Sequence, residues 1–313
     1  MEARRHYRHR TLEERVKIRS EVARLRGSGM SVKEVSEVLG ISRRDVSYWT
    51  RMNEPSRTVY NPDLSPRPEL TYLVGAYPGD GRTAGQQDKK VRFKVADLEF
   101  APLLNDLVAK VIGARLKSIS LDGGFHSVSY DCAGLYDFLQ QPLSAQIPLA
   151  ETFPAEFLRG FFDAEGYASQ TIRSGSGALT AISVGAANCN LDYLDLARRL
   201  LATLEMSSEI RMTNKAGQPR EIRGRTYIRK RNAFQVRVDE TDSVEKFQDR
   251  VGFSVPEKKQ KLADLVAMMS IPDEWDRYNH FTDLYEKKGR KWMRRTDASI
   301  GRPPGPAPKN NSK

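Results

Sequence analysis

Two short stretches of the sequence are alike: Leu70–Gly81, which reads LTYLVGAYPGDG, and Glu156–Gly166, which reads EFLRGFFDAEG. Each is apolar with helical periodicity, carries a glycine followed four residues later by glycine or alanine, and ends in an acid and a glycine. Small residues four apart share one helix face and let two backbones approach closely. The two stretches are therefore expected to pack side by side, with Asp80 and Glu165 together at one end.

The two acids define a chemical problem at that end. Carboxylates at the C-terminal ends of two helices repel each other and meet the negative ends of two helix dipoles. A stable arrangement needs a cation, and hard oxygen ligands with room for water and phosphate favour Mg²⁺, which beside a phosphodiester can activate water. The alternative is a helix pair in a non-enzymatic fold, although acids are electrostatically unfavourable there. Gly81 and Gly166 are expected to be left-handed residues that end the helices.

The two stretches resemble the signature of the LAGLIDADG homing endonucleases. GAYPGDG and GFFDAEG are variants of it, and their acids lie 85 residues apart, as in the single-chain, two-repeat form. Similar chain follows each copy, with Asp97 and Asn188 at matching helix-start positions. Gly252-Phe253, Lys258 and Leu262 resemble the GF-x4-K-x3-L segment of archaeal and intein-type members. The resemblance covers roughly residues 68–270.

The resemblance implies an α/β (α+β) fold of two pseudo-symmetric αββαββα repeats, with the signature helices at the interface and antiparallel strands forming a saddle over DNA. Prolines, periodicity and charge then divide the chain. The predicted parts are a helix-turn-helix domain at 1–52, a Pro-rich linker at 53–68, a first repeat at 69–153, a second repeat at 154–286 and a basic, disordered tail at 287–313. A short hinge is expected at 141–154.

The resemblance also implies an activity, which is cleavage of both strands of a long, nearly asymmetric duplex DNA site. Asp80 and Glu165, with Gly79 and Ala164 before them, would hold two or three Mg²⁺ ions shared between two active sites. A basic side chain usually assists at each site in this family, and Lys258 and Lys94 are the candidates. Lys258 is equally well interpreted as a plain surface lysine of the run EKKQK.

Basic residues are concentrated in particular segments. The chain has a formal charge of +11, of which residues 1–52 contribute +6 and residues 287–313 contribute +8, so that the region between them is slightly acidic. Residues 211–237 nevertheless carry +8 within a predicted strand–loop–strand. Such a surplus points to nucleic acid, although a solvated strand face would also explain it. The saddle residues expected to contact DNA are Arg82, Arg92, Arg223, Arg225, Arg229, Arg231 and Arg237.

The N-terminal segment has a helix-turn-helix pattern. Ser31 and Glu34 form a capping box before a short helix that Gly40 ends, and a second helix follows from Arg43 to Arg51. In this geometry the second helix enters the major groove of DNA. A small helical bundle that binds nothing is the alternative. Val32, Val35, Val38, Val46 and Trp49 are expected to face the core, and Arg43, Arg44, Ser47 and Arg51 to face DNA.

Pro78 departs from the signature. A proline inside a helix removes a hydrogen bond and clashes with the carbonyl four residues before it, here Val74, at a cost of roughly 3 kcal/mol. It is expected to kink the helix just before Asp80, and a displacement of about 1 Å can cost about a hundredfold in rate. The rival interpretation is therefore a catalytically weak or inactive sequence-specific DNA-binding protein, either a transcription regulator or an intron maturase.

Several other classes are disfavoured. No apolar run approaches the roughly 18 residues of a membrane span. Cys132 and Cys189 form no CxxC pair and the four histidines are scattered, so a disulfide scaffold and a structural zinc site are both improbable. The sequence predicts a monomeric, cytoplasmic, DNA-associated prokaryotic protein. RNA is a partner only in the maturase interpretation, because no stacking motif of the RRM type occurs.

Overall fold

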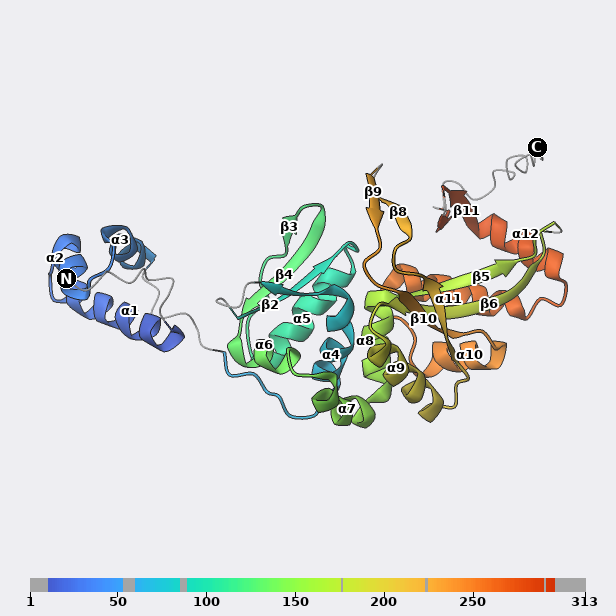
Figure 1. Cartoon of the computed structure of the whole chain (residues 1–313), viewed down its shortest axis with the longest axis horizontal. Helices are drawn as coiled ribbons and strands as arrows, with labels where there is room; N and C mark the ends of the chain where they lie inside the picture. The colour runs from blue at the N-terminus through green and yellow to red at the C-terminus, as the bar shows by residue number, and fades with distance from the viewer. Residues whose placement is uncertain are drawn as a thin grey trace. The chain divides into compact units, whose positions relative to one another are not determined.

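The protein is described here by a computed structural model that covers residues 11–52, 60–84, 89–175, 177–222, 225–289 and 291–295 (Figure 1). The chain forms two compact units, Met1–Tyr60 and Asn61–Lys313. Among the described residues, none of the helices combines the length and the apolar character that crossing a membrane requires.

The N-terminal unit contains three helices, α1 (Leu12–Gly27), α2 (Val32–Leu39) and α3 (Arg43–Met52). The capping box of Ser31 and Glu34 begins α2, and Gly40, at φ +62°, ends it. Val35 and Val46 are fully buried, and Trp49 packs against their cluster. Val38 was expected to join this core, but it is 62% exposed. The role of this unit in DNA contact stays a prediction.

The first repeat consists of α4 (Pro68–Asp80), β1 (Gly81–Ala84), β2 (Lys90–Val95), α5 (Phe100–Ile112), β3 (Ser120–Asp122), β4 (Phe125–Asp131) and α6 (Ala133–Leu139). Its antiparallel sheet has the strand order β1-β2-β4-β3. Along β2, half-buried and buried residues alternate, so one face of the sheet lies on α5 and the other is open.

The second repeat has the same plan, with α8 (Pro154–Glu165), β5 (Gly166–Ile172), β6 (Leu179–Asn188), α9 (Leu191–Thr203), β7 (Glu209–Asn214), β10 (Ala233–Val238) and α10 (Thr241–Arg250). The order β5-β6-β10-β7 is equivalent to that of the first sheet. The two αββαββα repeats are thus confirmed. One addition distinguishes the second: β8 (Pro219–Ile222) and β9 (Arg225–Ile228) form a hairpin that projects from between β7 and β10 (Figure 1), where a single loop was expected.

Two further segments differ from expectation. The hinge predicted at 141–154 contains helix α7 (Leu143–Thr152), which is held because Leu149 and Ala150 are buried. The boundary predicted for the disordered tail, residue 287, falls inside a folded segment. After α11 (Pro256–Met269) and α12 (Glu274–Leu284), strands β11 (Tyr285–Lys288) and β12 (Lys291–Arg294) form a hairpin, because Trp292 packs on Phe281 with ring centroids 4.9 Å apart. Residues 296–313 lie outside the described residues.

Helices α4 and α8 pack against each other between the two sheets (Figure 1). A Cβ atom at Gly75 would overlap the carbonyl oxygen of Phe157, and one at Gly160 would overlap that of Tyr72. The predicted close approach through small residues is confirmed. The expectation for Gly81 and Gly166 was wrong, because both have extended backbones. Glycine fits at both positions because the Cβ atom of a larger residue would overlap the preceding turn of the same helix.

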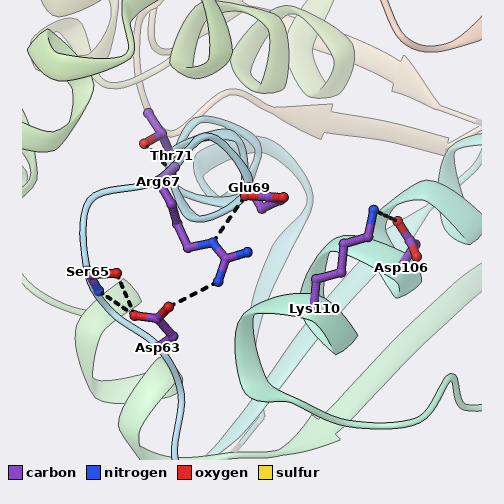
Figure 2. A network of polar contacts seen from close by, with 7 residues as sticks. All are labelled: Asp63, Ser65, Arg67, Glu69, Thr71, Asp106 and Lys110. Atoms are coloured by element: carbon purple, nitrogen blue, oxygen red, sulfur yellow. Dashed lines mark hydrogen bonds and ion pairs between the residues drawn. The ribbon is translucent and has the colours of Figure 1, made fainter.

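The segment that leads into α4 is fixed to the first repeat. Figure 2 shows Arg67, just before α4, donating to Asp63 and to Glu69, each at 3.1 Å, while Asp63 also accepts from Ser65. The main-chain N–H of Asp63 donates to Val111 of α5 at 2.9 Å. Residues 61–67 of the predicted linker therefore belong to the folded repeat, and residues 53–59 lie outside the described residues.

Candidate active site

Asp80 and Glu165 end the two central helices at the same end of the interface. A Cβ atom on Gly79 would lie 2.8 Å from Cγ of Glu165 and 2.9 Å from Cβ of Ala164, so the last turns of α4 and α8 are in contact. Each helix is followed directly by a strand, β1 or β5, that starts at the next glycine. The fold thus brings together the two acids that the sequence singled out, at the point where both sheets begin.

Asp80 and Glu165 are half-buried, and their electrostatics are those of two carboxylates largely withdrawn from water. Burial raises the pKa of Asp80 to about 7, the nearby charge of Glu165 adds to that effect, and Lys258 and Arg82 oppose it. Burial also raises the pKa of Glu165, opposed first by a hydrogen bond of 2.8 Å from the Asn188 amide to its Oε1. The pair therefore favours protons or another cation over two free negative charges.

Lys258 supplies an ammonium group to this site. Its Nζ donates to the main-chain oxygens of Asp163 at 2.6 Å and of Phe162 at 3.3 Å, at the C-terminal end of α8. It also lies 5.8 Å from the centre of the Phe253 ring. Burial lowers the pKa of Lys258, and four carboxylates, Asp163, Asp80, Asp97 and Glu165, act against that change. Between the two interpretations of this lysine, the geometry agrees with a site residue.

Asp163 is a site residue that sequence reasoning missed. Its carboxylate accepts hydrogen bonds from the Tyr72 hydroxyl at 2.5 Å, from the Ser254 N–H at 3.0 Å and from the Val255 N–H at 3.2 Å. The residue is 2% exposed, and burial raises its pKa. The available signal was its position in GFFDAEG, where the first signature copy has Pro78.

The strand registers correct one expected correspondence. Gly81 pairs with Phe93 and Gly166 pairs with Ala186, so the counterpart of Asn188 is Val95 and that of Asp97 is Asn190. The side chains of Asp97 and Asn190 both accept N–H groups at the start of the next helix, whereas Asn188 lies two residues earlier and reaches Glu165. Glu165 thus has the Asn188 amide as a partner, whereas the equivalent position in the first repeat is the buried Val95, which offers Asp80 no hydrogen bond.

The basic candidates of the first repeat separate into two groups. Lys94 is not brought to the acids, since its ammonium is 2.6 Å from Asp122 on β3. Arg82 is the basic residue of this repeat that acts on both acids. It lies directly opposite Arg92 on the neighbouring strand, and the Nε atom of Arg92 is buried without a hydrogen-bond partner in the described part of the chain. Two arginines side by side indicate a place for an anion.

The equivalent position in the second repeat carries no charge. Tyr167, the counterpart of Arg82, lies opposite Gly185, and its hydroxyl is 2.7 Å from Oε1 of Gln235. Arg237 is paired with Asp239 at 3.2 Å. Arg159, a phosphate candidate, instead donates to the carbonyl of Val251 at 2.6 Å.

The remaining DNA-contact candidates lie on α3 and in the segment 223–231. On α3, Arg43 and Arg44 are exposed and Ser47 is half-buried, while on the loop after β9 Arg229 is half-buried and Arg231 exposed. Residue 223 and the side chains of Arg51 and Arg225 lie outside the described residues.

The donor set fits a hard divalent cation. Two half-buried carboxylates whose pKa values are raised offer the oxygen ligands that Mg²⁺ prefers. Among the described residues, no cluster of three or more His, Cys, Asp or Glu side chains could hold a metal by itself. An ion at this place would therefore have to draw ligands from elsewhere as well.

Part of the chain matches a known protein family. Residues 152–252 match the family model described as LAGLIDADG-like domain. The match covers most of the second repeat, and there it confirms the resemblance that the signature indicated.

Particular relatives are similar over more of the chain. The uncharacterized protein MJ0398 of Methanocaldococcus jannaschii is 29% identical over 244 residues, covering 75% of this chain and 86% of its own. Full-length DUF199/WhiA from Thermatoga maritima has a TM-score of 0.42 at 15% identity and covers 71% of this chain and 68% of its own. I-DmoI in complex with DNA and Mn has a TM-score of 0.41 at 16% identity, and the match covers 59% of this chain and 96% of its own.

Proposed function

We propose that the protein is a site-specific double-strand DNA endonuclease that hydrolyses phosphodiester bonds with Mg²⁺. The observation that carries the proposal is the pairing of the half-buried Asp80 and Glu165 at the ends of α4 and α8. Such a pair is unfavourable unless a cation joins it, and the pKa of Asp80, which burial and then the charge of Glu165 raise to about 7, reflects that cost. Both acids belong to one chain, which supports action as a monomer.

Each residue of the site has a part in this proposal. Asp80 and Glu165 would hold Mg²⁺, with Gly79 and Ala164 beside them, and the ion supplies an activated water and charge neutralisation at the leaving oxygen. Asn188 orients Glu165, and Lys258 balances negative charge. Arg82 and Arg92 would receive a DNA phosphate, because their adjacent guanidinium groups need an anion opposite.

Duplex DNA would lie along the open faces of the two sheets. On β2 the half-buried positions are Lys90, Arg92 and Lys94, all basic, while the alternate positions form the core. The basic loop after β9, with Arg229 and Arg231, would extend this surface. The N-terminal unit would add contacts through Arg43 and Arg44 on α3, so the footprint would be long and asymmetric.

A second candidate function is sequence-specific DNA binding without cleavage, as in a regulator or a maturase. Pro78 favours it, because it occupies the interior of α4 two residues before Asp80, where the second repeat has Asp163. The first half of the site therefore has no equivalent of the Asp163 carboxylate, which in the second half accepts hydrogen bonds from Ser254 and Val255.

The test is cleavage of a randomised duplex library with Mg²⁺, comparing the wild type with Asp80→Asn and Glu165→Gln. Asp122→Asn is the control, since this exposed acid pairs only with Lys94 among the described residues. Binding is measured with Ca²⁺ in place of Mg²⁺. The proposal expects cleavage by the wild type and the control, and binding without cleavage by the other two. Equal binding by all four proteins with no cleavage would establish the second candidate instead.

A further inference from the structure

Helix α11 follows both repeats and carries Lys258 in its first turn. It begins at Pro256, directly after Ser254 and Val255, whose N–H groups both point to one carboxylate, that of Asp163. The start of a helix leaves N–H groups without partners, and a carboxylate there is favourable for both hydrogen bonding and the dipole. Asp163 thus caps a helix from 91 residues away in the sequence.

The segment before α11, residues 252–255, places the start of the helix next to this carboxylate. Gly252, at φ +63°, makes the turn after α10. Phe253 is 4% exposed and packs on Phe247, which in turn contacts Phe162 of α8. Leu262, one turn beyond Lys258, is 2% exposed. These contacts fix α11 along its length, while the Asp163 carboxylate fixes its first turn.

We infer that Asp163 is a positioning residue, which docks the start of α11 through Ser254 and Val255 and thereby holds the Lys258 ammonium against the last turn of α8, the turn that Glu165 ends. The Tyr72 hydroxyl, donating to the same carboxylate at 2.5 Å, ties this dock to the first repeat. The inference rests on the proposed function of the site for its catalytic consequence, but the position of Lys258 is a property of the folded chain. Pro78, at the equivalent position, offers no such carboxylate, so among the described residues the first repeat has no equivalent of this dock.

The position of Lys258 is tested by amine labelling of the full chain, followed by mass spectrometry. Lys259 is the internal reference, because it is exposed on the same turn. In Asp163→Asn the side-chain nitrogen cannot accept, so a buried N–H loses its partner, and we expect Lys258 to label about tenfold faster relative to Lys259. Tyr72→Phe removes the hydroxyl alone and is expected to give a smaller increase. It also serves as the test if Asp163→Asn does not fold.

Asp264→Asn is the matched control. Asp264 lies on the same helix and accepts from the Tyr285 hydroxyl at 2.7 Å, from Arg294 at 3.0 Å and from the Gln260 amide at 2.8 Å, and all three of these partners lie beyond the first turn of α11. It should leave Lys258 labelling at the wild-type rate. The inference is overturned if Asp163→Asn and Tyr72→Phe leave the labelling within twofold of wild type, or if Asp264→Asn raises it equally.

The catalytic consequence is tested by a double-mutant cycle on single-turnover cleavage. If Asp163 acts through Lys258, Asp163→Asn slows cleavage about tenfold in the wild type and does not slow it further in Lys258→Met. Additive losses would overturn the role. DNA affinity with Ca²⁺ should stay unchanged in both. If the wild type binds but does not cut, the proposed endonuclease fails while the labelling result still decides the position of Lys258.

Discussion

Asp80, at the end of α4, is the side chain of the site whose ionisation is expected to affect the stability of the protein most. Its pKa is raised from an ordinary value of 3.8 to about 7, because the group is buried and faces Glu165. As pH rises from 4 to 7 the unfolded chain has already released this proton while the folded protein still holds it. The contribution of Asp80 to the free energy of unfolding is therefore greatest at low pH and disappears as pH rises to about 7.

Replacing Asp80 by Asn should remove this pH dependence. In metal-free protein, Asp80→Asn and wild type should melt at similar temperatures near pH 4. The variant should become the more stable protein as pH increases, by on the order of 4 kcal/mol above pH 7, since a tenfold change in proton affinity corresponds to about 1.4 kcal/mol. Calorimetry in EDTA across this range measures the difference. A gap that is constant with pH would contradict the assignment.

Among the elements, the contact of α4 with α8 depends on two glycines, Gly75 and Gly160, whose lack of a side chain lets the helices approach. Gly75→Ala or Gly160→Ala would push a methyl group into a main-chain carbonyl of the facing helix, with no flexible side chain to yield. We expect either change to lower the free energy of unfolding by about 3 kcal/mol. Chemical denaturation measures it. Gly27→Ala, in a helix with nothing within 4 Å, is the control and should be neutral or slightly stabilising.

How far the sequence predicted these elements depends on the range of the contacts that hold them. The signature helices were predictable because Gly75 and Gly160 act within patterns of a few residues. The partner of Glu165 was missed because Asn188 and Asp97 differ by two positions in register, which only the strand pairing shows. Asp163 was missed because its partners lie about 91 residues away, and no local pattern marks them.

Extra elements were hard to predict for a related reason. The β8–β9 hairpin lies inside a basic, polar stretch that has the composition of a loop. The β11–β12 hairpin is fixed by Trp292 on Phe281, a contact between an apparently charged tail and the preceding helix. In both places the charge pattern indicated the surface character correctly, while the fold depended on a few apolar or main-chain contacts.

Across the whole molecule, the two repeats share a topology but not a charge pattern. Arg82 and Arg92 adjoin the acids on the first sheet, and Tyr167 and Gly185 take their places on the second. Lys258 is held by the second repeat alone. The two halves of the proposed active site therefore differ in the groups available to bind and neutralise a phosphate.

This asymmetry predicts unequal cleavage of the two DNA strands. In single-turnover reactions with each strand labelled separately, one strand should be cut at least about tenfold faster, so that nicked duplex accumulates. Arg82→Ala should slow one strand more than the other, whereas Lys94→Ala, whose side chain pairs with Asp122, should change neither by more than about twofold. Equal rates for both strands would contradict this expectation.

The basic residues outside the site should act through salt-sensitive affinity. Removing a side chain that binds one phosphate reduces the slope of log K against log salt concentration by about 1. We expect that reduction for Arg229→Ala and Arg231→Ala near β9, and for Arg43→Ala and Arg44→Ala on α3, with cleavage of bound DNA unchanged. Titrations of a labelled duplex at several salt concentrations measure it. Variants with unchanged slopes would remove those residues from the DNA interface.

The place of Lys258 in the chain has a consequence for how the protein is made. A ribosome releases Asp80 first, then Glu165, and Lys258 only after both repeats have been synthesised. The matched LAGLIDADG-like domain ends at residue 252, so the cation that balances the acids is encoded beyond it. A chain without α11 would present the two acids without this ammonium, so the charge balance of the site depends on the helix that follows both repeats.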